Sequence, residues 1–243
     1  MVMVIRPIIV LILLLTTSLS GCAASTKVSA DLRILDDPPE KVNIGIIQKV
    51  ENPALDAARQ GFLHTLSTYG YFEGDNLTVD YQNAGNNESV LQTIAEKFAS
   101  GNYDLILAVA TPAALAMARE TPKIPILLTA ATDPLAAKLV ESMDNPGTNV
   151  TGTTDMYPVQ EQFKLMKRLF PSMQNVGVLY NAKEVNSQIQ LGLIQDTADI
   201  LTLNIVEASV SAGTDVPQAG QSLVGKVDAI YIPNDRTVIL EAQ

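Results

Sequence analysis

Small polar and acidic residues recur directly after the apolar segments of this chain, and they are the residues best suited to chemistry. A carboxylate can accept a charge-assisted hydrogen bond from an ammonium group. Main-chain N–H groups at the beginning of a helix can bind a carboxylate without the help of arginine. Both kinds of group occur in this set, which therefore suits a small zwitterion such as an amino acid. The candidate ligand-binding residues are Gln48, Asn52, Thr111, Ala113, Thr132, Asp133, Asp155, Asn181, Asn186 and Asp235.

Each of these residues also has a simpler interpretation. A single Thr, Asn or Asp before a helix is more often only a helix cap. What favours a binding site is that the same pattern returns at several strand ends in both halves of the chain. Where strands are parallel, their carboxyl ends lie along one edge of the sheet, and ligands bind beyond that edge.

The segment around Thr111 shows most clearly how the predicted elements would position these residues. Asp104 to Ala110 is an apolar run without a polar face, which is typical of a parallel strand buried on both sides. Thr111 can cap a helix, and Pro112 suits the first helical position. The sequence therefore predicts a buried strand that leads directly into a helix beginning.

The same alternation of strand and helix continues through the chain and predicts an α/β fold with parallel sheets flanked by helices. The pattern restarts near Asp155, and Asn43-Ile44-Gly45 is echoed by Asn175-Val176-Gly177. This restart indicates an N-terminal lobe over 41–155 and a second lobe over 156–243. By its count of strand–helix units, the second lobe is expected to be incomplete.

The N-terminus resembles a bacterial lipoprotein signal. An apolar run from Ile8 to Leu15 is too short to span a bilayer but suits a secretory signal. It is followed by Leu19-Ser20-Gly21-Cys22, so residues 1–22 are predicted to be a signal peptide and Cys22 the lipidated residue. Residues 23–40 are then a flexible tether. An ordinary signal peptide with an incidental Cys, or an uncleaved anchor, remains an alternative.

Composition excludes several other functions. The 243 residues are 47% hydrophobic and carry a formal net charge of −10, which argues against a nucleic-acid partner. A single histidine, His64, leaves little basis for a histidine metal site or a Ser-His-Asp triad. No G-x-S-x-G motif is present. We therefore expect no enzyme activity, no metal and no cofactor.

Several segments of this chain form a specific pattern when taken together. They are Glu51–Asp56, Ala110–Ala114, Ala131–Pro134, Asn149–Gly152 with Asp155-Met156, and Gln221–Tyr231. In these segments the chain resembles the substrate-binding lipoproteins of ABC transporters, of the tryptophan/tyrosine-binding type, and the resemblance covers nearly all of 41–233. It implies a two-lobed, periplasmic-binding-protein-like fold of type I that closes on its ligand by a hinge. It also implies an aromatic amino acid (Trp, Tyr or Phe) as ligand, a membrane permease and its ATPase as partners, and a lipid anchor on the outer side of the cell membrane.

Two departures from this family leave alternatives open. Family members continue for several more strand–helix units, and they carry a Thr-Asp-Asn-Thr-like strand end where this chain has Asn234-Asp235-Arg236-Thr237. Arg236 would either clamp a ligand carboxylate or alter the pocket. The alternatives are a truncated copy without binding activity and a non-transport sensor domain of the same fold.

Overall fold

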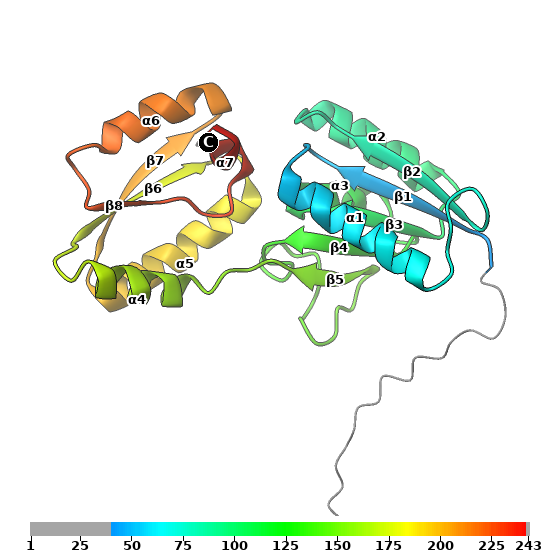
Figure 1. Ribbon diagram of the computed structural model, residues 1–243, viewed down its shortest axis with the longest axis horizontal. Helices are drawn as coiled ribbons and strands as arrows, with labels where there is room; N and C mark the ends of the chain where they lie inside the picture. The colour runs from blue at the N-terminus through cyan, green and yellow to red at the C-terminus, as the bar shows by residue number, and fades with distance from the viewer. Residues whose placement is uncertain (1–39, 242–243) are drawn as a thin grey trace, which may run out of the picture. The chain divides into compact units, whose positions relative to one another are not determined.

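The computed structural model describes residues 40–241, which begin with a five-stranded, entirely parallel sheet. Its strand order is β2-β1-β3-β4-β5 (Figure 1). β2 and β5 therefore lie at the two edges of this sheet. The elements are β1 (Val42–Gln48), α1 (Pro53–Thr68), β2 (Leu77–Asn83), α2 (Glu88–Ser100), β3 (Leu105–Val109), α3 (Thr111–Glu120), β4 (Ile126–Ala131) and β5 (Val150–Thr154).

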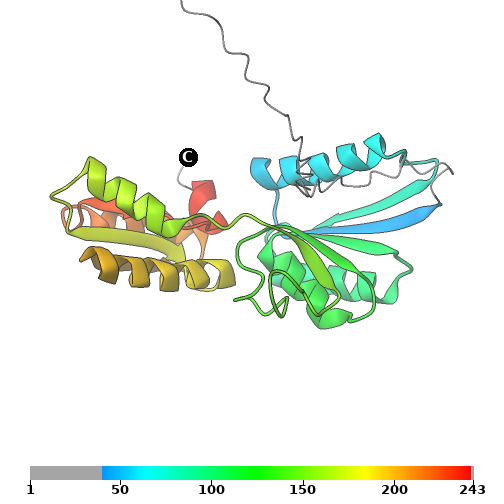
Figure 2. The same ribbon diagram turned by 90° about the horizontal axis from the view of Figure 1, so that it is seen from below.

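Helices cover both faces of this first sheet, with α1 on one face and α2 and α3 on the other (Figure 2). Successive side chains of a strand point to opposite faces. Ile46 therefore packs in the core that includes Leu55 of α1, while Ile47 packs in the core that includes Phe98 of α2. Both isoleucines are fully buried, which explains why β1 has no polar face.

The second sheet has three parallel strands in the order β7-β6-β8. The core on one face includes Phe163 of α4 and Ile194 of α5, and that on the other face includes Val216 of α6 and Val238 of α7. The elements are α4 (Val159–Leu169), β6 (Asn175–Asn181), α5 (Val185–Leu201), β7 (Asn204–Val210), a short 3-10 helix η1 (Gly213–Asp215), α6 (Val216–Leu223), β8 (Ala229–Tyr231) and α7 (Arg236–Glu241).

The two sheets share an interaction at the same place. In the first sheet, the Asp104 carboxylate accepts a hydrogen bond of 2.8 Å from the Asn43 N–H. In the second sheet, the Asp228 carboxylate accepts one of 2.8 Å from the Asn175 N–H. Asp104 directly precedes β3, which pairs with β1, and Asp228 directly precedes β8, which pairs with β6. The restart seen in the sequence therefore corresponds to two sheets built on the same local plan.

The segment after Asp133-Pro134 does not form a helix. Asp133-Pro134 has the residue types of a helix beginning, as Thr111-Pro112 does, but the structure forms a series of turns from Pro134 to Lys138. The Ala137 N–H donates to the Asp133 carbonyl over 2.9 Å, which makes a single helix-like turn. Lys138 then adopts a φ of 58°, in the left-handed region, so the helix cannot continue.

The N-terminal predictions lie outside the described residues. These are the signal peptide at 1–22, Cys22 and all but the last residue of the tether at 23–40. Within 40–241, none of the helices has both the length and the apolar character needed to cross a membrane. Both sheets belong to one compact unit of the chain.

Candidate functional site

Thr111 joins two neighbouring strand ends rather than capping a helix. The cap position belongs to Ala110, whose φ of 74° turns the chain sharply from β3 into α3. Thr111 is the first helical residue, and its hydroxyl accepts a hydrogen bond of 3.2 Å from the N–H of Thr132, just after β4. The expectation that Thr111 caps the helix is therefore corrected. Ala113 packs its side chain into the core, so only its main-chain N–H could face a ligand.

Asp155 and Thr132 meet Asn234 from the second sheet. The Asn234 side-chain amide donates to Asp155 Oδ2 over 2.8 Å and to Thr132 Oγ1 over 3.3 Å. Asp155 is itself fixed, because its N–H donates to the Ala131 carbonyl at the end of β4 over 3.1 Å. Its second carboxylate oxygen, Oδ1, is buried and has no hydrogen-bond partner among the described residues. A buried oxygen of this kind is expected to have a donor.

The main chain of Asn234 is held by α5. Its N–H donates to Gln190 Oε1 over 2.5 Å, and its carbonyl accepts from Asn186 Nδ2 over 2.6 Å. The other polar atoms of these two side chains, Asn186 Oδ1 and Gln190 Nε2, are buried without a partner among residues 40–241. Together with Asp155 Oδ1, three buried polar atoms on side chains that bond to Asn234 therefore lack a hydrogen-bond partner within residues 40–241.

Asp235 holds the second sheet together and is fully buried. Its Oδ2 accepts hydrogen bonds from the Asn181 N–H and from the Ser187 hydroxyl, the latter over 2.7 Å. Its Oδ1 accepts from the Val238 N–H at the beginning of α7, over 3.0 Å. Asn181 adds a bond of 2.9 Å from its side-chain amide to the Thr237 hydroxyl. Because both oxygens of Asp235 are already used, this carboxylate fixes the strand ends.

Three other candidates make local contacts in the first sheet. Gln48 Nε2 donates to Asp56 Oδ1 over 2.8 Å, while Gln48 Oε1 is buried without a partner in the described part of the chain. Asn52 caps α1 by accepting from the Ala54 N–H over 2.9 Å. Asp133 accepts from the Ala136 N–H over 2.9 Å. Within residues 40–241, no hydrogen bond joins Gln48, Asn52 or Asp133 to the residues around Asn234.

A cavity of about 180 Å3 lies beside the carboxyl ends of β1, β3 and β6. Pro112 and Leu115 of α3 contribute apolar surface, and Lys49 follows the end of β1. From the second sheet, Lys183 and Glu184 reach it just before α5. The cavity is therefore lined by residues that follow strands of both sheets.

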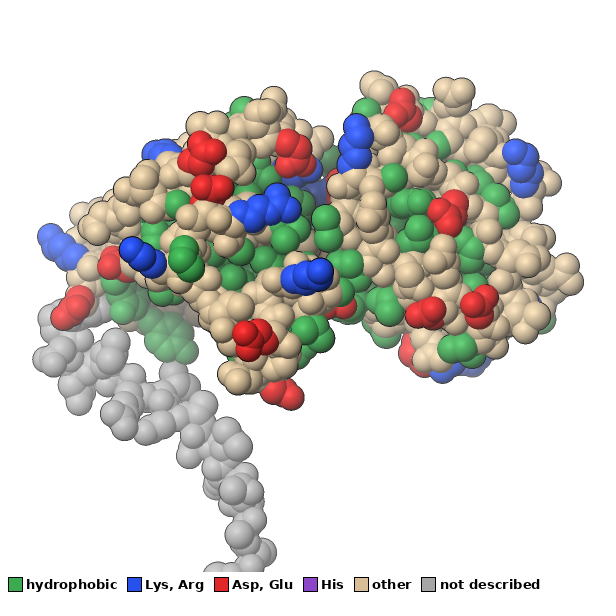
Figure 3. All heavy atoms as spheres, turned by 180° about the vertical axis from the view of Figure 1, so that it is seen from behind, with side chains coloured by type: hydrophobic (Ala, Val, Ile, Leu, Met, Phe, Trp, Pro, Cys, Tyr) green, Lys and Arg blue, Asp and Glu red, His purple; other side chains and the backbone are tan. Residues whose placement is uncertain are grey.

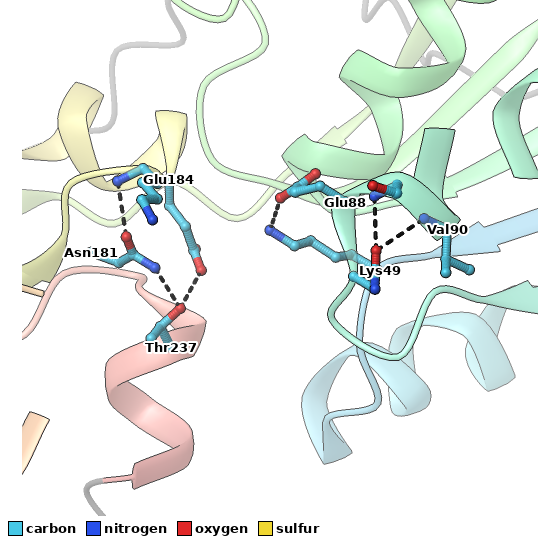
Figure 4. A network of polar contacts seen from close by, with 9 residues as sticks. Lys49, Glu88, Val90, Asn181, Glu184 and Thr237 are labelled. Atoms are coloured by element: carbon cyan, nitrogen blue, oxygen red, sulfur yellow. Dashed lines mark hydrogen bonds and ion pairs between the residues drawn. The ribbon is translucent and has the colours of Figure 1, made fainter. Parts of the chain in front are cut away.

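Two of the charged residues that line this cavity, Lys49 and Glu184, are fixed by neighbours (Figure 4). Lys49 is nearly buried and forms an ion pair with Glu88 at the beginning of α2. Glu184 is also buried, and it accepts a hydrogen bond of 2.8 Å from the Thr237 hydroxyl. Sequence reasoning did not select Lys49 or Glu184, because each gains its role from a partner far away in the chain.

Arg236 adds a cation close to this region. Burial lowers the pKa of the Arg236 guanidinium, and the carboxylates of Glu184, Asp155 and Asp235 act in the opposite direction by raising it. Asn234 and Arg236 stand in the strand end that the sequence singled out, although only Asp235 was selected there. Beyond this site, acidic, basic and apolar side chains are interspersed over the face of the molecule shown in Figure 3.

The structure thus brings the candidates together in two groups that meet at Asn234. Asn186 contacts the main chain of Asn234, and Asp235 follows it directly. The groups are Thr111, Thr132 and Asp155 from the first sheet, and Asn181, Asn186 and Asp235 from the second.

Comparison with known proteins identifies the family. Residues 43–242 match the family model for ABC transporter substrate binding proteins. A curated tyrosine-binding protein from Clostridioides difficile is 43% identical over 91% of this chain, and the chain spans 64% of the length of that relative.

Solved structures agree with this assignment. A conserved domain protein from Vibrio cholerae is 40% identical, with a TM-score of 0.80, and the match covers 83% of this chain and 68% of that protein. The ABC domain from Streptococcus pneumoniae in complex with L-Trp is 32% identical, with a TM-score of 0.79, covering 84% of this chain and 68% of its own. A leucine-binding protein from Thermotoga maritima is 15% identical, with a TM-score of 0.61, and the match covers 79% of this chain and 55% of that protein. At this identity the likeness shows the fold alone. The architecture is the two-lobed, type I periplasmic-binding-protein fold, and the chain belongs to the ABC transporter substrate-binding protein family.

Proposed function

We propose that this chain binds an aromatic amino acid where the strand ends of its two sheets meet at Asn234. Two relatives support this ligand class, since one is named for tyrosine binding and another was solved with L-Trp. The observation that carries the proposal is the buried, unpartnered oxygen Oδ1 of Asp155. In the bound state, this oxygen accepts a hydrogen bond from the ligand ammonium.

Asp155 is well prepared for this role. Its Oδ2 is already held by Asn234 over 2.8 Å, and its main chain is held by Ala131, so the carboxylate does not need to reorient when the ligand arrives. Such preorganisation lowers the entropic cost of binding. Asp155, Thr132 and Asn186 then contact the polar end of the ligand, together with the N–H of Ala113. Thr111, Asn181 and Asp235 keep the strand ends in place.

The neighbouring cavity accepts the aromatic ring. An engineered apolar cavity of about 150 Å3 holds a benzene molecule, so a volume of about 180 Å3 is adequate for one ring. Leu115, Pro112 and the buried Leu91 supply apolar surface there. The other lining residues are mainly charged or polar, among them Lys49, Arg119 and Glu184. The ring is therefore expected to lie on the apolar part of a largely polar cavity.

The family and the N-terminal sequence support a proposal for the biological setting. The chain delivers its ligand to a membrane permease that is driven by an ATPase, and it acts outside the cytoplasm. Lipidation at Cys22 anchors it to the membrane, and residues 23–40 form the tether between the lipid and the binding region. The sheets over 41–155 and 156–243 act as two lobes that close on the ligand.

Titration calorimetry of the purified chain tests this proposal. L-Trp, L-Tyr and L-Phe are expected to bind, and 3-phenylpropionate, which lacks the ammonium group, is expected to bind at least about tenfold more weakly. Asp155→Asn should reduce the affinity for the amino acids by about ten- to a hundredfold. Asp144→Asn is the matched control, because Asp144 is an exposed acid in the loop before β5. Equal affinity of wild type and Asp155→Asn would contradict the role of Asp155.

A further inference from the structure

Arg236 occupies a position that is fixed by the residues on either side of it. Asn234 bonds to Asp155 and Thr132, and Thr237 bonds to Asn181 and Glu184. The main chain that carries Arg236 is therefore tied to both sheets. The Arg236 side chain itself is only partly buried, so it keeps access to solvent or to a ligand.

Each acid around Arg236 has at least one oxygen that already accepts a hydrogen bond from another donor. Asp235 accepts from the Asn181 and Val238 N–H groups and from a serine hydroxyl. Glu184 Oε1 accepts from a threonine hydroxyl, and Asp155 Oδ2 accepts from an asparagine amide. In the described part of the chain, no hydrogen bond and no ion pair within 4.0 Å is formed by the Arg236 guanidinium.

A partly desolvated guanidinium without a direct partner is costly. Arginine is seldom buried unless it is paired, since each N–H donor that loses water then gains no acceptor in return. The direction of the pKa shift of Arg236 agrees, because burial is the leading influence and lowers that pKa despite three nearby carboxylates. An anion that arrives from outside would supply the missing acceptor.

We infer that Arg236 is a specificity-determining residue that pairs with the carboxylate of the bound ligand. This inference rests on the proposed function and deepens it. The planar guanidinium offers two parallel N–H donors that match a carboxylate, which an ammonium or an amide does not reproduce. The ligand is then recognised at both charged groups, the ammonium by Asp155 and the carboxylate by Arg236. Ligands that carry an aromatic ring and an ammonium but no carboxylate are excluded.

The test compares L-phenylalanine with L-phenylalaninamide in titration calorimetry, at a pH at which both amines are protonated. Wild type should prefer the acid over the amide by about ten- to a hundredfold, which is the range for one hydrogen bond to a charged group. Arg236→Gln should bind the acid more weakly, and its ratio of the two affinities should fall to within about threefold of unity. Arg236→Lys, which keeps the positive charge but loses the two parallel N–H donors, should give an intermediate ratio of the two affinities.

Two features keep this experiment decisive. The affinity ratio does not depend on the fraction of folded protein, so partial misfolding of a variant cannot imitate the predicted result. Lys226→Gln is the control, because Lys226 is an exposed cation in the turn before β8 that does not line this cavity, so its removal should leave the ratio unchanged. Binding by wild type with the same ratio in Arg236→Gln would overturn the inference but not the proposed function. Absence of binding of any aromatic amino acid by wild type would overturn both.

Discussion

The side-chain amide of Asn234 donates a hydrogen bond of 2.8 Å to Asp155, and this bond connects the second sheet to the first. Asn234 follows β8, and Asp155 follows β5, so the bond joins two strand ends that lie 79 residues apart. The same amide donates to Thr132 over 3.3 Å. The Asn234 side chain thus orients the Asp155 carboxylate, which we propose accepts a hydrogen bond from the ligand ammonium.

Asn234→Ala should weaken the binding of the amino acid by about three- to thirtyfold, because Asp155 loses the donor that orients it. The strand end itself should persist, since the main chain of Asn234 is held by Gln190 and Asn186. Calorimetry measures the affinity, and circular dichroism checks the fold. Asn145→Ala, in an exposed turn, is the control. Unchanged affinity in Asn234→Ala would show that Asp155 needs no support from the second sheet.

Asp235→Asn should lower the free energy of unfolding by about 2–4 kcal/mol, since three buried donors lose a charged acceptor. These donors are the N–H groups of Asn181 and Val238 and the hydroxyl of Ser187. Urea unfolding measures the change. The control is Asp215→Asn, because Asp215 is exposed and accepts two long bonds of 3.2 and 3.3 Å. Its effect should stay below about 1 kcal/mol. Similar losses for both variants would argue against the central structural role of Asp235.

Gly152→Ala should destabilise the first sheet by at least about 2 kcal/mol. Gly152 has a φ of 148°, and an added Cβ would lie 2.0 Å from the Leu128 carbonyl oxygen. The matched variant is Gly61→Ala, inside α1, where no atom lies within 4 Å of an added Cβ. Because alanine is a better helix former, Gly61→Ala should stabilise the protein by about 0.5–1 kcal/mol. Thermal unfolding distinguishes the two, and equal midpoints would refute the argument from geometry.

The hydrogen bond between Tyr180 and Glu207 predicts a pH dependence of stability in the alkaline range. Burial and then the Glu207 carboxylate, 2.8 Å from the hydroxyl, raise the pKa of Tyr180 to about 12 from its ordinary 10.0. The resulting stabilisation is fully present below about pH 10 and is lost as pH rises through about 12. Since Glu207 is exposed, the contribution should be less than about 1 kcal/mol.

Urea unfolding of wild type and Tyr180→Phe at a series of pH values measures this effect. The advantage of wild type should be constant from neutral pH to about pH 10 and then shrink. Glu207→Gln, which removes the acceptor charge, should shift this decrease to lower pH. A difference between wild type and Tyr180→Phe that is constant up to pH 12 would contradict the assignment.

Local signals in the sequence predicted most elements of the fold. The buried strand predicted over Asp104 to Ala110 forms as β3 (Leu105–Val109), and the predicted helix follows it as α3. A continuous apolar run followed by a proline suited to the first helical turn is a strong local signal for this pair of elements. Asn52-Pro53 and Asp133-Pro134 look alike as helix beginnings, yet only the first leads into a helix. The second ends after one turn at Lys138, whose left-handed φ the sequence does not reveal.

The site was harder to predict, because its contacts join residues that lie far apart in the sequence. The sequence identified Thr111 and Asp155 as strand ends, but the partner of Thr111 lies 21 residues away and that of Asp155 lies 79 residues away. A helix-capping pattern spans only three or four residues and cannot reveal such pairs. The role of Asn234 depends on its bonds to the first sheet, and that of Glu184 on its bond to Thr237, 53 residues away in the chain.

Equilibrium dialysis of the purified chain against an equimolar mixture of the common amino acids is the most direct test of the central claim. If the strand ends of the two sheets bind an aromatic zwitterion, the chain should retain Trp, Tyr or Phe in preference to all others. Asp155→Asn should retain much less of these amino acids than the control Asp144→Asn, which should retain as much as wild type. Retention of no amino acid by wild type, or preferential retention of a non-aromatic one, would contradict the account.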